Sequence, residues 1–286
     1  MTQSRKTDYT SLDIWKCIFN GKSIKYNDLK FIINHQKLDF LETQVIKEKE
    51  NYTSIETPFI SLSKARNTLM RVSLSKFKDY DFFIFVDDDA YIYDFNLLIE
   101  SLMYCKMKNF NGLIIGSIYK PNLQFINKHM QKKSEFKKLN FNDHNLIMGS
   151  CICFGRDLIR KKISFDSYFG LGSKYGGSEE TDLFFNSLVN KINVYYNQCF
   201  IVVHPPTYKN QYDFRKMFSY GTGRGAVYRK YLSINKTLFM SYLFYGLFGN
   251  FCLILIGILT FQKNLIMRNL GLFFGKINGF IVYRRK

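Results

Sequence analysis

The chain has 286 residues with a formal net charge of +18 at pH 7, and 47% of its residues are hydrophobic. This is enough apolar material for the core of one large α/β domain or of two smaller domains. The positive charge limits the expected partners to nucleic acid, an anionic membrane surface or a phosphate-bearing substrate. Residues 1–9 are polar and charged, so we expect no N-terminal signal peptide.

The cysteines show no paired metal-binding spacing such as C-x-x-C. Most lie inside apolar runs, which is typical of buried, reduced thiols in a cytosolic compartment. They are Cys17, Cys105, Cys151, Cys153, Cys199 and Cys252.

The N-terminal part of the chain alternates predicted helices and strands. Apolar residues at helical spacing predict a helix over 12–19, and a strand follows over 29–34. A second helix is predicted over 38–50 and a strand over 52–60. Such alternation predicts a Rossmann-like, mostly parallel sheet with helices on both faces.

A helix predicted over 63–77 leads into the stretch around which the chain is organised, a strand over 81–86. Its β-formers and aromatic residues predict burial on both faces. The three carboxylates that follow, Asp87, Asp88 and Asp89, would be prohibitively costly to bury uncompensated, so we expect them solvated or neutralised by a cation at the strand exit. Ligands bind at that end of strands in open α/β sheets; the alternative is a solvated acidic turn.

The middle of the chain continues the alternation. A helix is predicted over 95–107, and strands are predicted over 113–118 and 146–154. The lysine-rich segment 120–138 has weak periodicity and is predicted to be a mobile surface loop. A glycine-rich loop over 165–177 then opens into another helix.

That helix starts at the acidic pair Glu179 and Glu180, and a later strand over 199–203 ends at His204. The glutamate pair, His204 and the aspartate triplet thus all lie at the ends of predicted helices or strands.

The C-terminal part is predicted to meet a membrane. Residues 237–262 contain no charged residue and are long enough to cross a bilayer. A second apolar stretch over 270–283 is interrupted by Lys276, which indicates an interfacial or re-entrant segment. The predicted parts are a folded domain over 1–210, a basic glycine-containing connector over 211–236, and a segment of hydrophobic membrane-associated helices over 237–286.

Asp87 and Asp89 have the spacing of a cation site. Side chains alternate along an extended chain, so these two share a face and Asp88 does not. Mg²⁺ or Mn²⁺ takes oxygen ligands and commonly bridges a carboxylate to substrate phosphates. A metal so placed would neutralise the charge that builds on a departing diphosphate.

Three segments, in this order, resemble motifs of the inverting family 2 glycosyltransferases of the GT-A fold. Residues 61–67, Ser-Leu-Ser-Lys-Ala-Arg-Asn, are similar to the family's G-x-S-x-A-R-N segment. Residues 85–89, Phe-Val-Asp-Asp-Asp, are similar to its D-x-D, and residues 177–183, Gly-Ser-Glu-Glu-Thr-Asp-Leu, to its E-D-x-D-L. The resemblance covers roughly 11–206 and implies a GT-A-like α/β fold.

The resemblance implies roles for four carboxylates. Asp87 would hold the nucleotide ribose and Asp89 the metal on the diphosphate. Glu180 stands where the family has its general base, which takes a proton from the acceptor hydroxyl, and the neighbouring charge of Glu179 is of the kind that raises a carboxylate pKa toward neutrality. The alternative is an acidic helix start favoured by the helix dipole; the preceding glycine loop favours the base.

Three further residues each have two interpretations. Arg66 either contacts the nucleotide or anchors a helix end. His204 either completes the metal site, as in several metal-dependent relatives, or is structural before Pro-Pro. Arg224, within the sequence Tyr-Gly-Thr-Gly-Arg-Gly, either contacts the diphosphate or lies in a flexible hinge into the membrane segment.

The chain departs from the family pattern at two places. The family opens with an apolar strand, whereas residues 12–19 already predict the helix that follows it. The family's second strand ends in acidic residues near the nucleotide base, whereas residues 34–36 are Asn-His-Gln. These departures keep a catalytically inactive scaffold open as an alternative.

The sequence thus predicts a metal-dependent inverting glycosyltransferase with a UDP-linked sugar donor and a glycan or lipid-linked acceptor, acting in polysaccharide or glycolipid synthesis. It would lie on the cytoplasmic face of the cell membrane, anchored by its C-terminal segment. The alternatives are the inactive membrane-bound scaffold and a basic nucleic-acid-binding protein. The latter needs arginines and aromatics clustered on one surface, and the lysines here are spread along a loop, so we expect no nucleic-acid partner.

Overall fold

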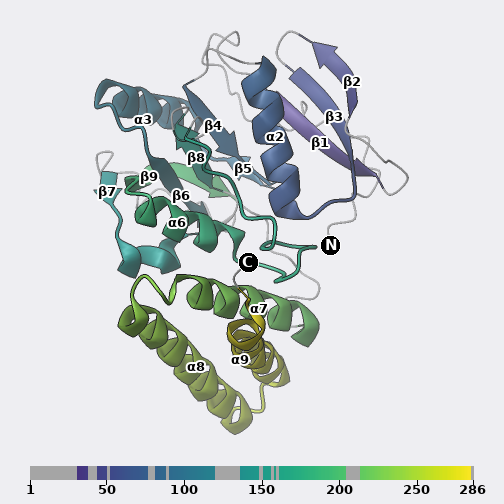
Figure 1. Cartoon of the computed structure of the whole chain (residues 1–286), viewed down its shortest axis with the longest axis vertical. Helices are drawn as coiled ribbons and strands as arrows, with labels where there is room; N and C mark the ends of the chain where they lie inside the picture. The colour runs from purple at the N-terminus through teal and green to yellow at the C-terminus, as the bar shows by residue number, and fades with distance from the viewer. Residues whose placement is uncertain are drawn as a thin grey trace. The chain divides into compact units, whose positions relative to one another are not determined.

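The computed structural model divides the chain into two compact units (Figure 1). The first contains all the strands that the structure describes, and the second contains Ser61–Ser63, Phe165–Phe185 and the C-terminal helices. The residues that the structure describes are 31–37, 44–49, 52–76, 81–87, 90–119, 136–147, 151–155, 158, 161–203 and 213–284.

A small sheet in the first unit consists of β1 (Phe31–Lys37), β2 (Gln44–Lys49) and β3 (Tyr52–Pro58), in the order β1-β3-β2. β1 is parallel to β3, and β2 is antiparallel to it. The predicted strands over 29–34 and 52–60 are confirmed where described. The helix predicted over 38–50 is wrong at β2, because Lys49 pairs with Tyr52 in hairpin fashion, and cross-strand bonds then satisfy the backbone groups that a helix would bond internally.

A six-stranded sheet follows in the same unit, with the order β4-β8-β6-β9-β5 and with β7 paired to β9. Only β6 and β9 are parallel among its described pairs, so the prediction of a mostly parallel sheet is wrong. The physical reason is that β8 pairs antiparallel with both neighbours, while β5 and β7 add antiparallel to β9. The strands are β4 (Phe82–Phe85), β5 (Tyr91–Ile92), β6 (Leu113–Tyr119), β7 (Phe136–Lys138), β8 (Ile152–Gly155) and β9 (Val194–Val203).

Two expectations about this sheet need correction. β4 is half-buried along its length rather than buried on both faces. β7 occupies the end of the segment predicted as a loop over 120–138, because Lys137 and its neighbours bond to β9. The core lies instead around Leu98, Ile114 and Phe200, which are fully buried.

The prediction of buried, reduced thiols is confirmed for the described cysteines of the six-stranded sheet region and α3. All described cysteines are free thiols; Cys252 is half-buried, and Cys17 lies outside the described residues. The buried ones are Cys105, Cys151, Cys153 and Cys199.

The two helices predicted over 63–77 and 95–107 are confirmed as α2 (Leu62–Lys76) and α3 (Phe95–Met107). α3 begins where the Asp94 carboxylate accepts a hydrogen bond from the Leu97 amide at 3.0 Å, an N-cap. The buried face of α2 contains polar as well as apolar side chains, including the guanidinium of Arg66. Its buried members are Ser63, Ala65, Arg66, Thr68, Met70 and Ser73.

The second unit is helical. It contains the start of α6 (Glu179–Val189), then α7 (Phe214–Tyr231), α8 (Lys236–Leu259) and α9 (Lys263–Val282). α8 and α9 are each long and apolar enough to cross a membrane by length and composition.

The segment predicted as a connector over 211–236 therefore contains a helix rather than a hinge. Its glycines pack α7 closely on α9: a Cβ on Gly225 would collide with the carbonyl oxygen of Lys276, and one on Gly221 would lie 3.0 Å from the Cα of Gly275. Small residues four apart on both helices allow backbones to approach in this way. Glycine here provides close packing, which the sequence pattern alone could not distinguish from flexibility.

Candidate functional site

Arg66 and Asp87 meet at the exit of β4 in the first unit. The Arg66 Nη2 donates to Asp87 Oδ1 at 3.4 Å. The Arg66 side chain is 5% exposed and that of Asp87 is 37% exposed. The guanidinium thus supplies part of the positive charge expected near the aspartate triplet. It leaves the Asp87 carboxylate accessible to a ligand.

The predicted metal ligands Asp89 and His204 lie outside the described residues, as does Asp88. Among the residues that the structure does describe, no three His, Cys, Asp or Glu side chains form a group that could hold a metal ion. The metal site therefore stays a prediction.

The glycine-rich loop in the second unit has an unusual backbone. Gly170, Gly172 and Gly176 have φ values of +97°, +77° and +72°, which glycine adopts without steric cost. Ser178, immediately before α6, has φ +65° although it carries a side chain. Backbone strain of this kind concentrates at functional sites, so the entry to α6 is a candidate for one.

Residues 61–63 anchor that loop. The Ser63 hydroxyl donates to the Phe169 carbonyl at 2.7 Å, and the Leu62 amide donates to the Leu171 carbonyl at 3.0 Å. The first residues of the motif over 61–67 thus serve the loop, which explains a serine at a helix start without any contact to substrate.

The two glutamates at the start of α6 differ in exposure. Glu179 is 3% exposed, and its carboxylate packs where a side chain at Gly170 would approach to 3.3 Å. Glu180 is half-buried. Of the pair, Glu180 is therefore the one with a partly accessible side chain.

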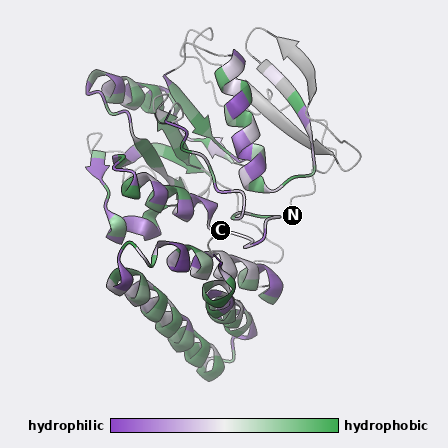
Figure 2. Ribbon diagram, in the orientation of Figure 1, coloured by the Kyte–Doolittle hydropathy of each residue, from purple (hydrophilic) through white to green (hydrophobic). Residues whose placement is uncertain are grey.

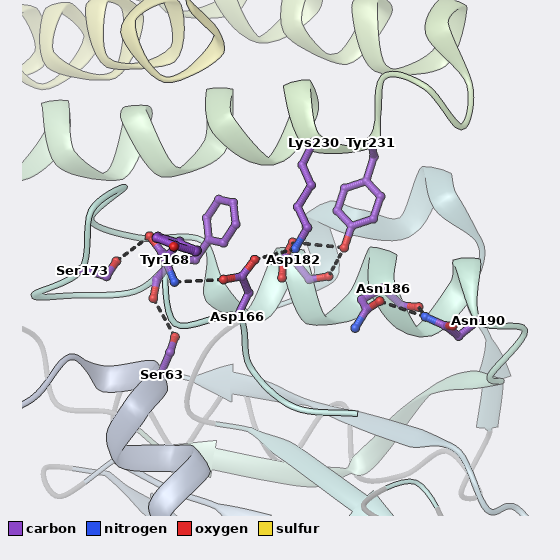
Figure 3. Close-up of polar contacts among 10 residues, drawn as sticks. Ser63, Asp166, Tyr168, Ser173, Asp182, Asn186, Asn190, Lys230 and Tyr231 are labelled. Atoms are coloured by element: carbon purple, nitrogen blue, oxygen red, sulfur yellow. Dashed lines mark hydrogen bonds and ion pairs between the residues drawn. The ribbon is translucent and has the colours of Figure 1, made fainter. Parts of the chain in front are cut away.

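A buried ionic cluster joins α6, α7 and the glycine-rich loop (Figure 3). The Lys230 Nζ lies 2.6 Å from Asp182 Oδ1 and 2.8 Å from Asp166 Oδ2. The Tyr231 hydroxyl donates to Asp182 Oδ1 and to the Asp182 carbonyl, both at 3.0 Å. The same lysine lies 5.2 Å above the Phe169 ring. The cluster fixes the first turn of α6, which holds Glu179 and Glu180.

Burial dominates the electrostatics of this cluster. It raises the pKa of Asp182 to about 6, against the opposing effect of Lys230. Burial also lowers the pKa of Lys230, but Asp182 and Asp166 raise it more, so its net shift is upward. At neutral pH the lysine is protonated, and Asp182 is mostly ionised.

Sequence reasoning missed this cluster. Asp182 lies inside the predicted E-D-x-D-L segment and Asp166 at the start of the glycine-rich loop, yet neither position indicates a partner. Lys230 and Tyr231 end a helix that was predicted as a connector. The available signal was a lysine among aromatic residues in the last turn of a periodic segment, which is too weak to name a contact.

Arg224 lies within α7 and is half-buried. Its guanidinium hydrogen bonds with the Tyr228 side chain, and its Nη1 is buried with no hydrogen-bond partner in the described part of the chain. Arg224 belongs to the second unit with Glu179 and Glu180, whereas Arg66 and Asp87 belong to the first.

Comparison with known proteins gives little to set beside this geometry. No protein family model matches the chain, and no curated protein matches it. Among solved structures the chain is similar to S. aureus TarS 1-349, with a TM-score of 0.37 and 13% sequence identity, over 77% of this chain and 72% of that chain. At these values the similarity supports no conclusion about fold or activity.

Proposed function

We propose that the chain is an inverting glycosyltransferase, which transfers a sugar from a nucleotide-sugar donor to an acceptor hydroxyl. The observation that carries the proposal is the contact between Arg66 and Asp87. These residues come from two separate motif segments that resemble family 2 glycosyltransferases, and they meet at the end of a strand. Asp87 keeps an accessible carboxylate there, as a group that binds ribose hydroxyls requires.

The proposed reaction is a single in-line displacement. The acceptor oxygen forms a bond to the anomeric carbon while the bond from that carbon to the diphosphate breaks, which inverts its configuration. The nucleoside diphosphate leaves with the electron pair, and Glu180 accepts the acceptor's proton. The buried cluster around Asp182 supports this role because it fixes the helical turn that carries Glu180.

A divalent cation, Mg²⁺ or Mn²⁺, is part of the proposal. Asp89 and His204 would hold it, since carboxylate oxygen suits both ions and imidazole nitrogen suits Mn²⁺. When bound, it supplies charge stabilisation to the departing diphosphate. Arg66 and Arg224 would add charge-assisted hydrogen bonds to the donor.

The proposed donor is UDP-linked, and the proposed acceptor is a glycan or a lipid-linked glycan at the cytoplasmic face of the membrane. The support for this location is the pair of apolar helices α8 and α9. An acceptor carried by a lipid would be presented at the same surface.

The test pairs each site carboxylate with a matched carboxylate elsewhere. Asp81 and Asp87 flank β4, and Asp81 is an exposed residue paired with Lys106. We expect Asp87→Asn to weaken UDP binding at least tenfold by calorimetry with Mn²⁺ present, and Asp81→Asn to leave it unchanged. Equal binding by both variants contradicts the role of Asp87.

Glu180→Gln should retain UDP binding while sugar transfer, measured as UDP release with acceptor present, falls by about 10²- to 10⁴-fold. The control is Glu100→Gln, which changes an exposed glutamate on α3. Full turnover by Glu180→Gln would exclude it as the base. Wild-type protein that binds no nucleotide at all would favour the inactive scaffold.

A further inference from the structure

The exposed surface of α8 is almost entirely apolar. Its buried residues are Phe239, Leu243, Asn250 and Gly257, which form one narrow stripe along the helix. The rest of the surface includes large side chains such as Phe248, which is 57% exposed, and Figure 2 shows hydrophobic colour along nearly the whole helix. An apolar face of this length is not typical of a surface that contacts water.

The charge around this face favours an anionic membrane as its partner. After Asp213 the chain contains twelve Lys and Arg residues and no Asp or Glu. Juxtamembrane cations of this kind are attracted to anionic lipid headgroups. Lys236 and Lys263 lie at the two ends of α8, so the apolar helix is bounded by cations at both ends.

One of the two helices that pack on α9 is the cationic helix α7. α7 and α9 run side by side and parallel, because Gly271 meets Met217, Gly275 meets Gly221, and Gly279 meets the backbone of Ala226. α7 cannot therefore be separated from α9 without breaking this backbone packing. The cations on α7 are Arg215, Lys216, Arg224, Arg229 and Lys230.

The depth of these cations can be worked out for a crossing helix. The Lys276 Nζ donates to the Gly246 carbonyl at 2.8 Å and to Asn250 Oδ1 at 2.5 Å, so Lys276 lies level with the middle of α8. Gly246 is ten residues from Lys236, or about 15 Å at 1.5 Å per residue. That is half of a hydrocarbon core about 30 Å thick.

If α8 crossed the bilayer, Lys276 and the adjoining turn of α7 with Arg224 would therefore lie near the bilayer centre. Charged groups at that depth are strongly disfavoured. Lys276 is bonded only to neutral oxygens in the contacts that the structure gives, so no carboxylate there compensates it.

We propose that the three C-terminal helices bind one leaflet and that none of them crosses the membrane. α8 lies in the membrane plane with its apolar surface in the acyl region, and Lys236 and Lys263 both lie at headgroup depth. α7 and α9 form the layer above it. The occupant of the α8 surface is thus an anionic lipid leaflet. The inference rests on the membrane location proposed above and is independent of the catalytic chemistry.

The test is the side of the membrane on which the turn between α8 and α9 lies. Ser233 and Asn264 are exposed residues just before α8 and just after it. Ser233→Cys and Asn264→Cys, each with Cys252→Ser, are expressed in cells and treated with a membrane-impermeant maleimide. We expect neither position to react in intact cells and both to react after permeabilisation. Reaction of Asn264→Cys in intact cells would show a crossing hairpin and overturn the proposal.

A second measurement tests the leaflet itself. We expect the full chain to float with vesicles in which one third of the lipid is anionic. We expect Phe248→Glu to reduce the bound fraction at least fivefold. The control Met107→Glu changes another exposed apolar residue, on α3, that is 75% exposed. A soluble wild-type protein that elutes as a dimer, and that Phe248→Glu converts to a monomer, would instead assign the α8 surface to a second copy and overturn the proposal. Neither measurement uses a sugar donor, so loss of the proposed enzymatic function would not affect them.

Discussion

Replacing Lys230 with methionine tests the buried cluster most directly. The substitution keeps most of the side-chain volume and removes the cation that lies 2.6 Å from Asp182, whose side chain is 1% exposed. Removing one partner of a fully buried ion pair costs about 3–5 kcal/mol, because the other charge stays buried and uncompensated. The Lys230 side chain is 23% exposed, so we expect the lower end of that range. For a chain of this size we expect the melting temperature to fall by on the order of 10 °C at pH 7.5.

The pH dependence gives the prediction its sign. Burial already raises the pKa of Asp182 to about 6, and loss of Lys230 removes an effect that lowers it. At pH 5 the carboxyl group is therefore protonated and neutral in the variant, so the loss of stability should be much smaller than at pH 7.5. Adding Asp182→Asn to Lys230→Met should restore part of the stability at pH 7.5.

The assay is thermal unfolding followed by circular dichroism in detergent at both pH values. Lys106→Met is the matched control, because Lys106 forms an ion pair of similar length, 2.8 Å, with Asp81 and both side chains are more than half exposed. Exposed pairs contribute at most about 1 kcal/mol. The reasoning is refuted if Lys230→Met costs no more than Lys106→Met at pH 7.5, or if its cost is the same at pH 5.

Three further predictions concern Asp182, the packing of α7 on α9, and Cys105. Because the pKa of Asp182 is raised, the folded state binds more protons than the unfolded state between about pH 4 and 6. The contribution of this residue to stability should therefore decline as pH rises through that window. In urea titrations, Asp182→Asn should remove this pH dependence. Gly225→Leu should destabilise the chain by more than about 2 kcal/mol because it separates α7 from α9, whereas Gly249→Leu, with no atom within 4 Å of its Cβ, should have little effect on the same unfolding measurement. Burial raises the pKa of the Cys105 thiol to about 12, so mass spectrometry after iodoacetamide treatment should find Cys105 unmodified in the native protein and modified after unfolding in urea; modification of Cys105 in the native protein would contradict its burial.

Local signals in the sequence were sufficient for several elements. α3 was predicted over 95–107, which are its observed bounds, and the structure shows an aspartate cap where it begins. The strand before Asp87 was identified from its run of β-formers and aromatic residues, and β6 covers the strand predicted over 113–118. These features depend on residues that are close together in the chain.

Strand direction and long-range pairing could not be obtained in this way. The period of side chains along β8 is the same whether its neighbours are parallel or antiparallel, so the sheet was predicted with the wrong sense. Likewise, nothing near Asp182 in the sequence indicates that its cation is 48 positions later. The two motifs that contain Arg66 and Asp87 could be identified from the sequence, but the contact between these residues could be seen only in the structure.

The first turn of α6 belongs to the second unit, and this has a mechanical consequence. The turn that carries Glu180 is bonded through Asp182 and Lys230 to the helix that packs on α9. If α8 rests in one leaflet, the proposed base is held at a constant height above the lipid phosphates, whatever the donor-binding strand does. The protein would then select lipid-linked acceptors by length. An acceptor hydroxyl reacts only when the glycan between it and the lipid is long enough to place it at the height of the base.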